Sequence, residues 1–160
     1  MKKRFVYAAV LAALLGSALH FLYDLVPAIP SAILSPINES PWEHLKLLFW
    51  PTLLAAFVLT RRAENKERMW SAFFLALLVM PCVLLAAYYL MVALGADSLW
   101  ADITLYFLTM FFGFFLAYRL RDSEKIGRIG GFLLMLVILY GSSLVLFSFA
   151  APDLPVFRAQ

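Results

Sequence analysis

Residues 99–118 read LWADITLYFLTMFFGFFLAY, an apolar run interrupted by one acidic residue, Asp102, near its start. A helix needs about 20 such residues to cross the ~30 Å hydrocarbon core of a bilayer. Backbone exposed to lipid has to satisfy its own hydrogen bonds, which restricts spanning structures to helices and closed barrels. The run therefore predicts a transmembrane helix.

Similar apolar segments lie on both sides of this run. They cover residues 5–26, 42–60, 70–94 and 132–150. The whole chain is 64% hydrophobic and only 14% charged, whereas soluble domains average about 45–50% apolar and about 25% charged residues. This composition excludes a water-soluble globule, and 160 residues leave no room for a sizeable extramembrane domain. We predict an all-α, polytopic membrane helix bundle with five transmembrane helices in a single domain, residues 1–160.

Basic residues mark one side of the predicted bundle. The sequence holds 13 Lys and Arg, and all but Lys46 and Arg158 lie in residues 2–4, 61–68 and 119–128. Alternating spans put these segments on one side, which the positive-inside rule makes cytoplasmic. We predict a multi-pass cell-membrane protein with its N-terminus inside and its C-terminus outside. Because the charges lie beside apolar runs, the net charge of +3 indicates topology rather than nucleic acid as a partner.

Ionisable residues at hydrocarbon depth are costly, and they are therefore the first candidates for function. In the first segment, His20 and Asp24 lie ~22 and ~28 Å from the inner end of a helix that rises ~1.5 Å per residue. Glu43 and His44 open the second segment at the same outer level, and Asp102 lies about one turn below the outer surface. The inner halves of the spans carry no ionisable acid, base or His. This pattern favours a one-sided site over a conduit across the membrane.

The stretch SPINESPWEHLKLLFWPT, residues 35–52, is the richest in chemical groups. Ser40, Pro41 and Glu43 fit an N-cap, a proline at the first helical position and the acid of a capping box, so a helix should begin here. Ser40 then acts as a cap rather than a nucleophile. Lys46, three residues after Glu43, can pair with it or extend to the headgroups, and neither role requires chemistry.

Capping does not account for Asn38, Glu39 and His44, nor for His20 and Asp24 at helical spacing on one face. Histidine and carboxylate are the usual ligands of catalytic zinc, and three protein ligands leave a position for water whose pKa falls to about 7. The sequence has no H-E-x-x-H spacing, so a divalent metal site, such as one for zinc, would be assembled across helices. The candidate metal ligands are His20, His44 and Asp24, with Glu39 or Asp102 as further choices. The candidate catalytic carboxylates are Glu43, Glu39 and Asp102. Tyr106, about two turns below the outer surface, is a further polar candidate.

The connection formed by residues 27–41 is unusually apolar for a loop. It holds four prolines among alanine, isoleucine and leucine. We predict that it lies at the interface as a lid or re-entrant cap over the polar layer. Such a lid would suit an amphiphilic substrate that enters from the lipid.

The string NESPWEHLKLLFWP at residues 38–51, with LHFLYD at residues 19–24, resembles a family of small bacterial integral membrane proteins of unknown function. The signature of that family is NES-x-WEHLK-LLF-x-P, after a first span that ends in a histidine. The resemblance implies no activity. It marks the following positions as characteristic: His20, Asn38, Glu39, Ser40, Trp42, Glu43, His44 and Lys46.

Three functions follow from these patterns. The leading hypothesis is a membrane-embedded metal-dependent hydrolase that acts on a lipid or lipid-linked substrate, with its site facing the outer leaflet. The second is a binding protein or transporter for a cation or a small polar solute at the same layer. The third is a structural or accessory subunit that binds a partner membrane protein or a second copy of the chain. Membrane lipids are partners in all three.

Overall fold

The computed structural model describes residues 2–96 and 98–158, and within these ranges it is helical with no strand. Five helices are long and apolar enough to cross a membrane. The first is the stretch Lys2–Leu25, made of α1 (Lys2–Leu19) and the short helix α2 (Leu22–Leu25). The others are α4 (Pro41–Thr60), α5 (Lys66–Ala93), α6 (Leu99–Leu120) and α8 (Gly130–Phe149). The connections contain the short helices α3 (Ile29–Leu34) and α7 (Glu124–Arg128), and a 3-10 turn, η1 (Pro155–Phe157), follows α8. The prediction of an all-α chain with five membrane-length helices is confirmed.

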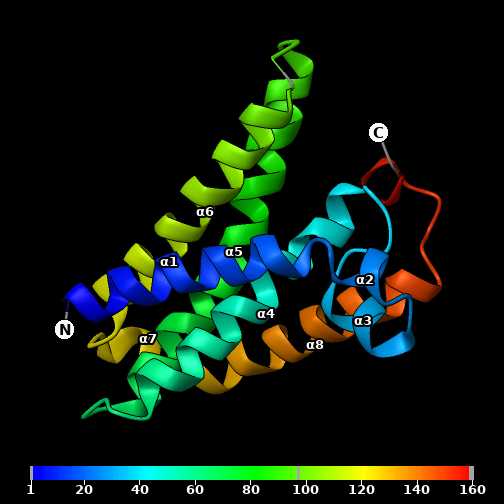
Figure 1. Ribbon diagram of the computed structural model, residues 1–160. Helices are drawn as coiled ribbons and strands as arrows, with labels where there is room; N and C mark the ends of the chain where they lie inside the picture. Colours follow the sequence, from blue (N-terminus) through cyan, green and yellow to red (C-terminus); the bar gives the residue numbers. More distant parts are fainter. Residues whose placement is uncertain (1, 97, 159–160) are drawn as a thin grey trace.

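Helix α5 is the central element of the bundle. It packs against α4, α6 and α8, and α1 crosses over α4 and α6 (Figure 1). The loop end of the α5–α6 hairpin diverges from the other helices, toward the top of Figure 1. Helices α2 and α3 instead gather at the end of α1, beside the C-terminal segment. The connection from α1 to α4 and the loop end of the α5–α6 hairpin therefore lie in two separate places.

The buried core draws on all five long helices, α1, α4, α5, α6 and α8. Phe73 of α5 is fully buried between two rings, at centroid distances of 5.8 Å from Phe5 and 5.7 Å from Phe114. Gly113 of α6 lies against the side chain of Met80, where a Cβ atom would overlap the methionine sulfur. An alanine at this position would force the Met80 side chain to shift, so the glycine lets α6 pack against α5 with Met80 in place.

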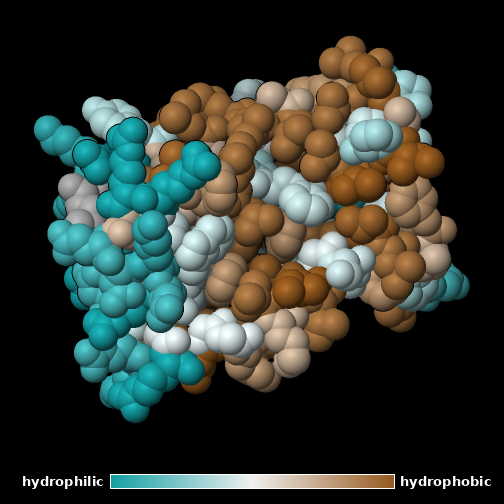
Figure 2. Space-filling model, turned by 90° about the horizontal axis from the view of Figure 1, so that it is seen from below, coloured by the Kyte–Doolittle hydropathy of each residue, from teal (hydrophilic) through white to brown (hydrophobic). Residues whose placement is uncertain are grey.

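The surface separates into a hydrophilic end and a broad apolar region. Figure 2 shows hydrophilic residues gathered at the end that holds the N-terminus, the α4–α5 turn and α7. We call this the basic end, defined by residues 2–4, 61–68 and 119–128. We call the end that holds α2, α3 and η1 the cap end. Most of the remaining surface is apolar, which is typical of a protein whose surroundings are lipid.

Candidate metal site

Helix α1 ends at Leu19, where the side chain of Ser35, from the cap end, interrupts its hydrogen bonds. In a continued helix the Tyr23 amide would donate to the Leu19 carbonyl. The Ser35 hydroxyl lies between these two groups instead: Oγ donates to the Leu19 oxygen at 2.6 Å and accepts from the Tyr23 nitrogen at 3.2 Å. A side chain inserted in this way interrupts the helical hydrogen-bond ladder. His20 consequently lies in the turn directly after α1.

The start of α4 is built as the sequence predicts, with one change. Ser40 Oγ accepts from the Glu43 amide at 3.4 Å, and Pro41 is the first helical residue, so the predicted cap is confirmed. The Ser40 amide donates to Asn38 Oδ1 at 2.9 Å rather than to the carboxylate of Glu43. The resulting turn precedes α4 and places Glu39 beside His44, which lies in the first turns of that helix.

The structure brings His20, Glu39 and His44 into one group. Each offers a ligand atom, and the three atoms lie within 4.8 Å of one another. Glu39 Oε2 lies 3.3 Å from His44 Nε2, and Glu39 Oε1 lies 3.9 Å from His20 Nε2. The histidine side chains are half-buried and Glu39 is 66% exposed, so the group opens at the surface of the cap end. Two imidazoles and a carboxylate at this spacing could hold a metal ion.

The surroundings of His44 restrict its protonation. Nδ1 lies 2.8 Å from the Ser40 carbonyl oxygen, which can only accept, so Nδ1 carries a hydrogen. In a neutral ring Nε2 would then present a lone pair to the Glu39 carboxylate, which is repulsive. Either a second proton or a cation between the two groups removes this repulsion. Donation of the other ring N–H to a backbone carbonyl is also the usual arrangement of a metal-binding histidine.

Lys46 is buried at the same end of the protein. Its side chain is fully buried, and Nζ donates to Glu43 Oε2 at 2.6 Å, to the Ala32 carbonyl at 2.7 Å and to the Ser35 carbonyl at 3.2 Å. The predicted pairing with Glu43 is confirmed, and the alternative of a side chain that extends to the headgroups is not observed. Lys46 therefore ties α3 and the segment after it to α4.

Glu43 completes this buried network. Its Oε2 atom also accepts from the Ile37 amide at 3.0 Å, and its Oε1 atom accepts from the Ser148 hydroxyl of α8 at 2.8 Å. Both carboxylate oxygens are thus used to join α4 to the cap and to α8. The structure does not place Glu43 in the group of His20, Glu39 and His44.

The other predicted acids also lie outside this group. The predicted helical face shared by His20 and Asp24 is not formed, because α1 ends at Leu19, and Asp24 is exposed in α2. Asp102 is exposed in the first turn of α6, on the hairpin that diverges from the cap end (Figure 1).

The two predicted aromatic residues have packing roles. The Tyr106 hydroxyl donates to the Ala13 carbonyl at 3.0 Å and so joins α6 to α1. The Trp42 ring packs between Phe147 and Phe157, at centroid distances of 5.6 and 4.9 Å, and holds the C-terminal turn against α4 and α8. Neither aromatic residue belongs to the group of His20, Glu39 and His44, which we call the metal-capable group.

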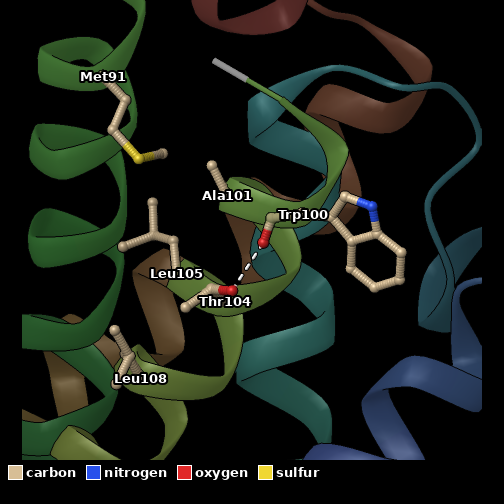
Figure 3. A pocket seen from close by; sticks show the side chains of 6 residues that line it. All are labelled: Met91, Trp100, Ala101, Thr104, Leu105 and Leu108. Carbon is tan, nitrogen blue, oxygen red and sulfur yellow. Dashed lines mark hydrogen bonds between the residues drawn. The ribbon is translucent and has the colours of Figure 1, made fainter. Parts of the chain in front are cut away.

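A hollow between α5 and α6 is not part of the site. Figure 3 shows its lining, which is apolar apart from Thr104 and one backbone carbonyl, and its volume is about 390 Å³. The Thr104 hydroxyl donates to the Trp100 carbonyl at 2.7 Å, and the Trp100 indole points away from the other lining residues. None of the predicted ligands or catalytic carboxylates lines this hollow.

The chain belongs to DUF6512, a family of unknown function, which it matches over residues 1–160. This result fits the expected resemblance to an uncharacterised family. No curated protein and no solved structure matches the chain. Its function therefore has to be argued from the geometry of the site.

Proposed function

We propose that this member of DUF6512 is a multi-pass membrane protein that binds a divalent metal ion of the zinc class through His20, Glu39 and His44. The observation that carries the proposal is the position of the His44 ring between two acceptors, the Ser40 carbonyl and the Glu39 carboxylate. A metal ion at Nε2 would replace the repulsion with two coordinate bonds. His20 Nε2 faces the other oxygen of the same carboxylate and supplies the third ligand.

The donor set favours zinc over the hard cations. Magnesium and calcium prefer shells made of oxygen, whereas imidazole suits zinc and its transition-metal neighbours. Two histidines and one glutamate are a known ligand set of catalytic zinc, with water in the fourth position. The exposed Glu39 leaves that position accessible from the surface.

The location of the site indicates the kind of substrate. The positive-inside rule places the basic end in the cytoplasm, so the cap end faces outward at the level of the lipid headgroups. A metal bound there would lower the pKa of its water to about 7 and polarise a carbonyl or phosphoryl oxygen. We therefore assign the protein as a metal-dependent hydrolase of an ester or phosphoester bond in a lipid or lipid-linked molecule.

The first experiment is a zinc titration of chelator-treated, detergent-purified protein against a chromophoric competitor. We expect one equivalent to bind, and we expect His20→Ala, His44→Ala and Glu39→Gln each to lose at least about 10-fold in affinity. Asp24→Asn and Asp102→Asn are matched controls, because these acids lie outside the group. Circular dichroism and thermal unfolding establish that every variant is folded.

Two results would overturn the metal site: no zinc bound to folded wild type, or equal losses in the control variants. The first would leave the contact between His44 and Glu39 without a metal-binding role. The hydrolase assignment has a separate test, the zinc-dependent release of headgroup or fatty acid from vesicles. Zinc binding without any such release would favour the cation-binding or transport hypothesis.

A further inference from the structure

A furrow runs along the outside of the bundle between α1 and α4. Its volume is about 490 Å³, and α1, α3, α4 and α5 all contribute to its walls. The lining consists entirely of leucine, phenylalanine and tryptophan side chains. Leu54 and Phe57 of α4 are 53% and 45% exposed, so the furrow opens onto the apolar surface of the protein.

One end of the furrow adjoins the metal-capable group. Leu19 of its wall directly precedes His20, and Leu34 belongs to α3 of the cap. The Trp50 indole N–H, in the same wall, donates to the Ile33 carbonyl at 2.9 Å and fixes α3 above the furrow. The furrow thus begins beneath the cap, at the residue that precedes the first of the three proposed ligands in the chain.

The other end of the furrow lies toward the basic end. From Trp50 to Phe57 it follows α4 for about 10 Å, at ~1.5 Å per residue. It is closed by Trp70, in the second turn of α5. The axis of the furrow therefore runs from headgroup level into the hydrocarbon region, as a lipid chain does.

The walls favour a hydrocarbon chain over a helix as the occupant. Helices pack closely in membranes where glycine and alanine let their backbones approach, and this furrow is lined by large side chains instead. A hydrocarbon chain can follow such walls without leaving a polar group unpaired. The indole N–H of Trp50 already has its partner in Ile33.

We infer that the furrow binds one hydrocarbon chain of an outer-leaflet lipid whose headgroup lies at His20, Glu39 and His44. This inference rests on the proposed function and specifies the substrate. The substrate is a lipid held by its chain along α1 and α4, with the bond to be cleaved at the end of the furrow. Leu15, Leu54 and Phe57 would then contact the chain and select for its length.

The test uses a phospholipid with a diazirine in one acyl chain, added in trace to vesicles of phosphatidylethanolamine and phosphatidylglycerol that contain the full-length protein. After photolysis, the labelled residues are mapped by mass spectrometry, with and without zinc. We expect several-fold more label at Leu15 and Leu54 than at Leu11 and Leu139, which are exposed but line neither the furrow nor the hollow between α5 and α6. We also expect zinc to increase the furrow label.

Filling the furrow provides the matched comparison. Leu54→Trp should reduce the furrow label to the level of ordinary lipid contact, whereas Leu11→Trp should leave it unchanged. Both variants should keep wild-type zinc affinity, because neither residue touches the proposed ligands.

Two outcomes would overturn the inference. Furrow label no higher than at Leu11, with zinc still bound, would indicate bulk lipid contact only, and it would refute the chain site and leave the metal proposal standing. Strong furrow label in a protein that binds no zinc would refute the headgroup placement together with the proposed function.

Discussion

Replacing Ser35 with alanine should destabilise the protein and also displace a proposed metal ligand. Ser35 is fully buried, and its hydroxyl is the shared partner of the Leu19 carbonyl and the Tyr23 amide. Ser35→Ala removes both hydrogen bonds at once. A buried polar group left unpaired costs about 1–3 kcal/mol. The Leu19 carbonyl and the Tyr23 amide would both lose this partner, and part of the cost is recovered as the chain relaxes. Together they should lower the free energy of unfolding by about 2–4 kcal/mol.

The relaxation itself has a direction. Without the hydroxyl, the Tyr23 amide can donate straight to the Leu19 carbonyl, which closes the ladder and extends α1 through His20. The imidazole of His20 would then move away from Glu39. We expect zinc affinity to fall by at least about 10-fold, although Ser35 is not a ligand.

Ser17→Ala is the control variant, because Ser17 Oγ donates to the Ala13 carbonyl one turn back in the same helix and interacts with the Tyr106 hydroxyl, so its loss leaves the Ser35 hydrogen bonds to Leu19 and Tyr23 in place. Unfolding is followed by tryptophan fluorescence in detergent with increasing dodecyl sulfate, and zinc affinity by competition. We expect Ser17→Ala to change stability by less than about 1 kcal/mol and zinc binding not at all. If Ser35→Ala matched Ser17→Ala in both measurements, our explanation for the end of α1 would be refuted.

Three further substitutions test the packing around the site, each by the same unfolding assay. Lys46→Met leaves Glu43 buried without its cation and should lower the free energy of unfolding by about 3–5 kcal/mol. When Glu43→Gln is added, the double variant should lose less stability than the sum of the two single variants. Additive losses would contradict the ion pair. Tyr106→Phe removes one hydrogen bond to α1 and should lower the free energy of unfolding by about 0.5–1.5 kcal/mol. Zinc affinity should stay unchanged, and weaker zinc binding would contradict the packing role of Tyr106. Gly113→Ala forces a methyl group against the Met80 side chain and should cost about 1–3 kcal/mol. Full stability would show that Met80 moves aside without straining the contact between α5 and α6.

Local features of the fold could be predicted from the sequence. The apolar runs give five helices of the required length, because hydropathy reports the surroundings of each segment directly. The start of α4 at Pro41 follows from Ser40 and its neighbours, since a cap involves residues only a few positions apart. The pairing of Lys46 with Glu43 is local in the same sense.

The interruption of α1 could not be predicted in this way. Its cause, Ser35, is 16 residues from Leu19, and nothing in residues 5–26 signals a break. Helical spacing therefore predicted that His20 and Asp24 share a face, whereas the folded chain places Glu39 beside His20. The hydrogen bond from Ser148 to Glu43 spans 105 residues and leaves no pattern in the sequence.

The position of a residue along its helix was predictable, but the lateral position of the helix was not. Counting residues places Asp102 in the first turn of its helix, as it does His44. The same count does not reveal that the α5–α6 hairpin diverges from the cap end (Figure 1). That divergence depends on how side chains pack deep in the bundle, where α6 lies against α5 at Gly113.

X-ray absorption at the zinc edge, on protein loaded with one equivalent of metal, tests the central claim most directly. The proposed site predicts two imidazole nitrogens and light oxygen ligands at about 2.0–2.1 Å, with one imidazole lost in His20→Ala and in His44→Ala. A zinc ion surrounded only by water and phosphate oxygens, with the same spectrum in both variants, would contradict a metal site made by His20, Glu39 and His44.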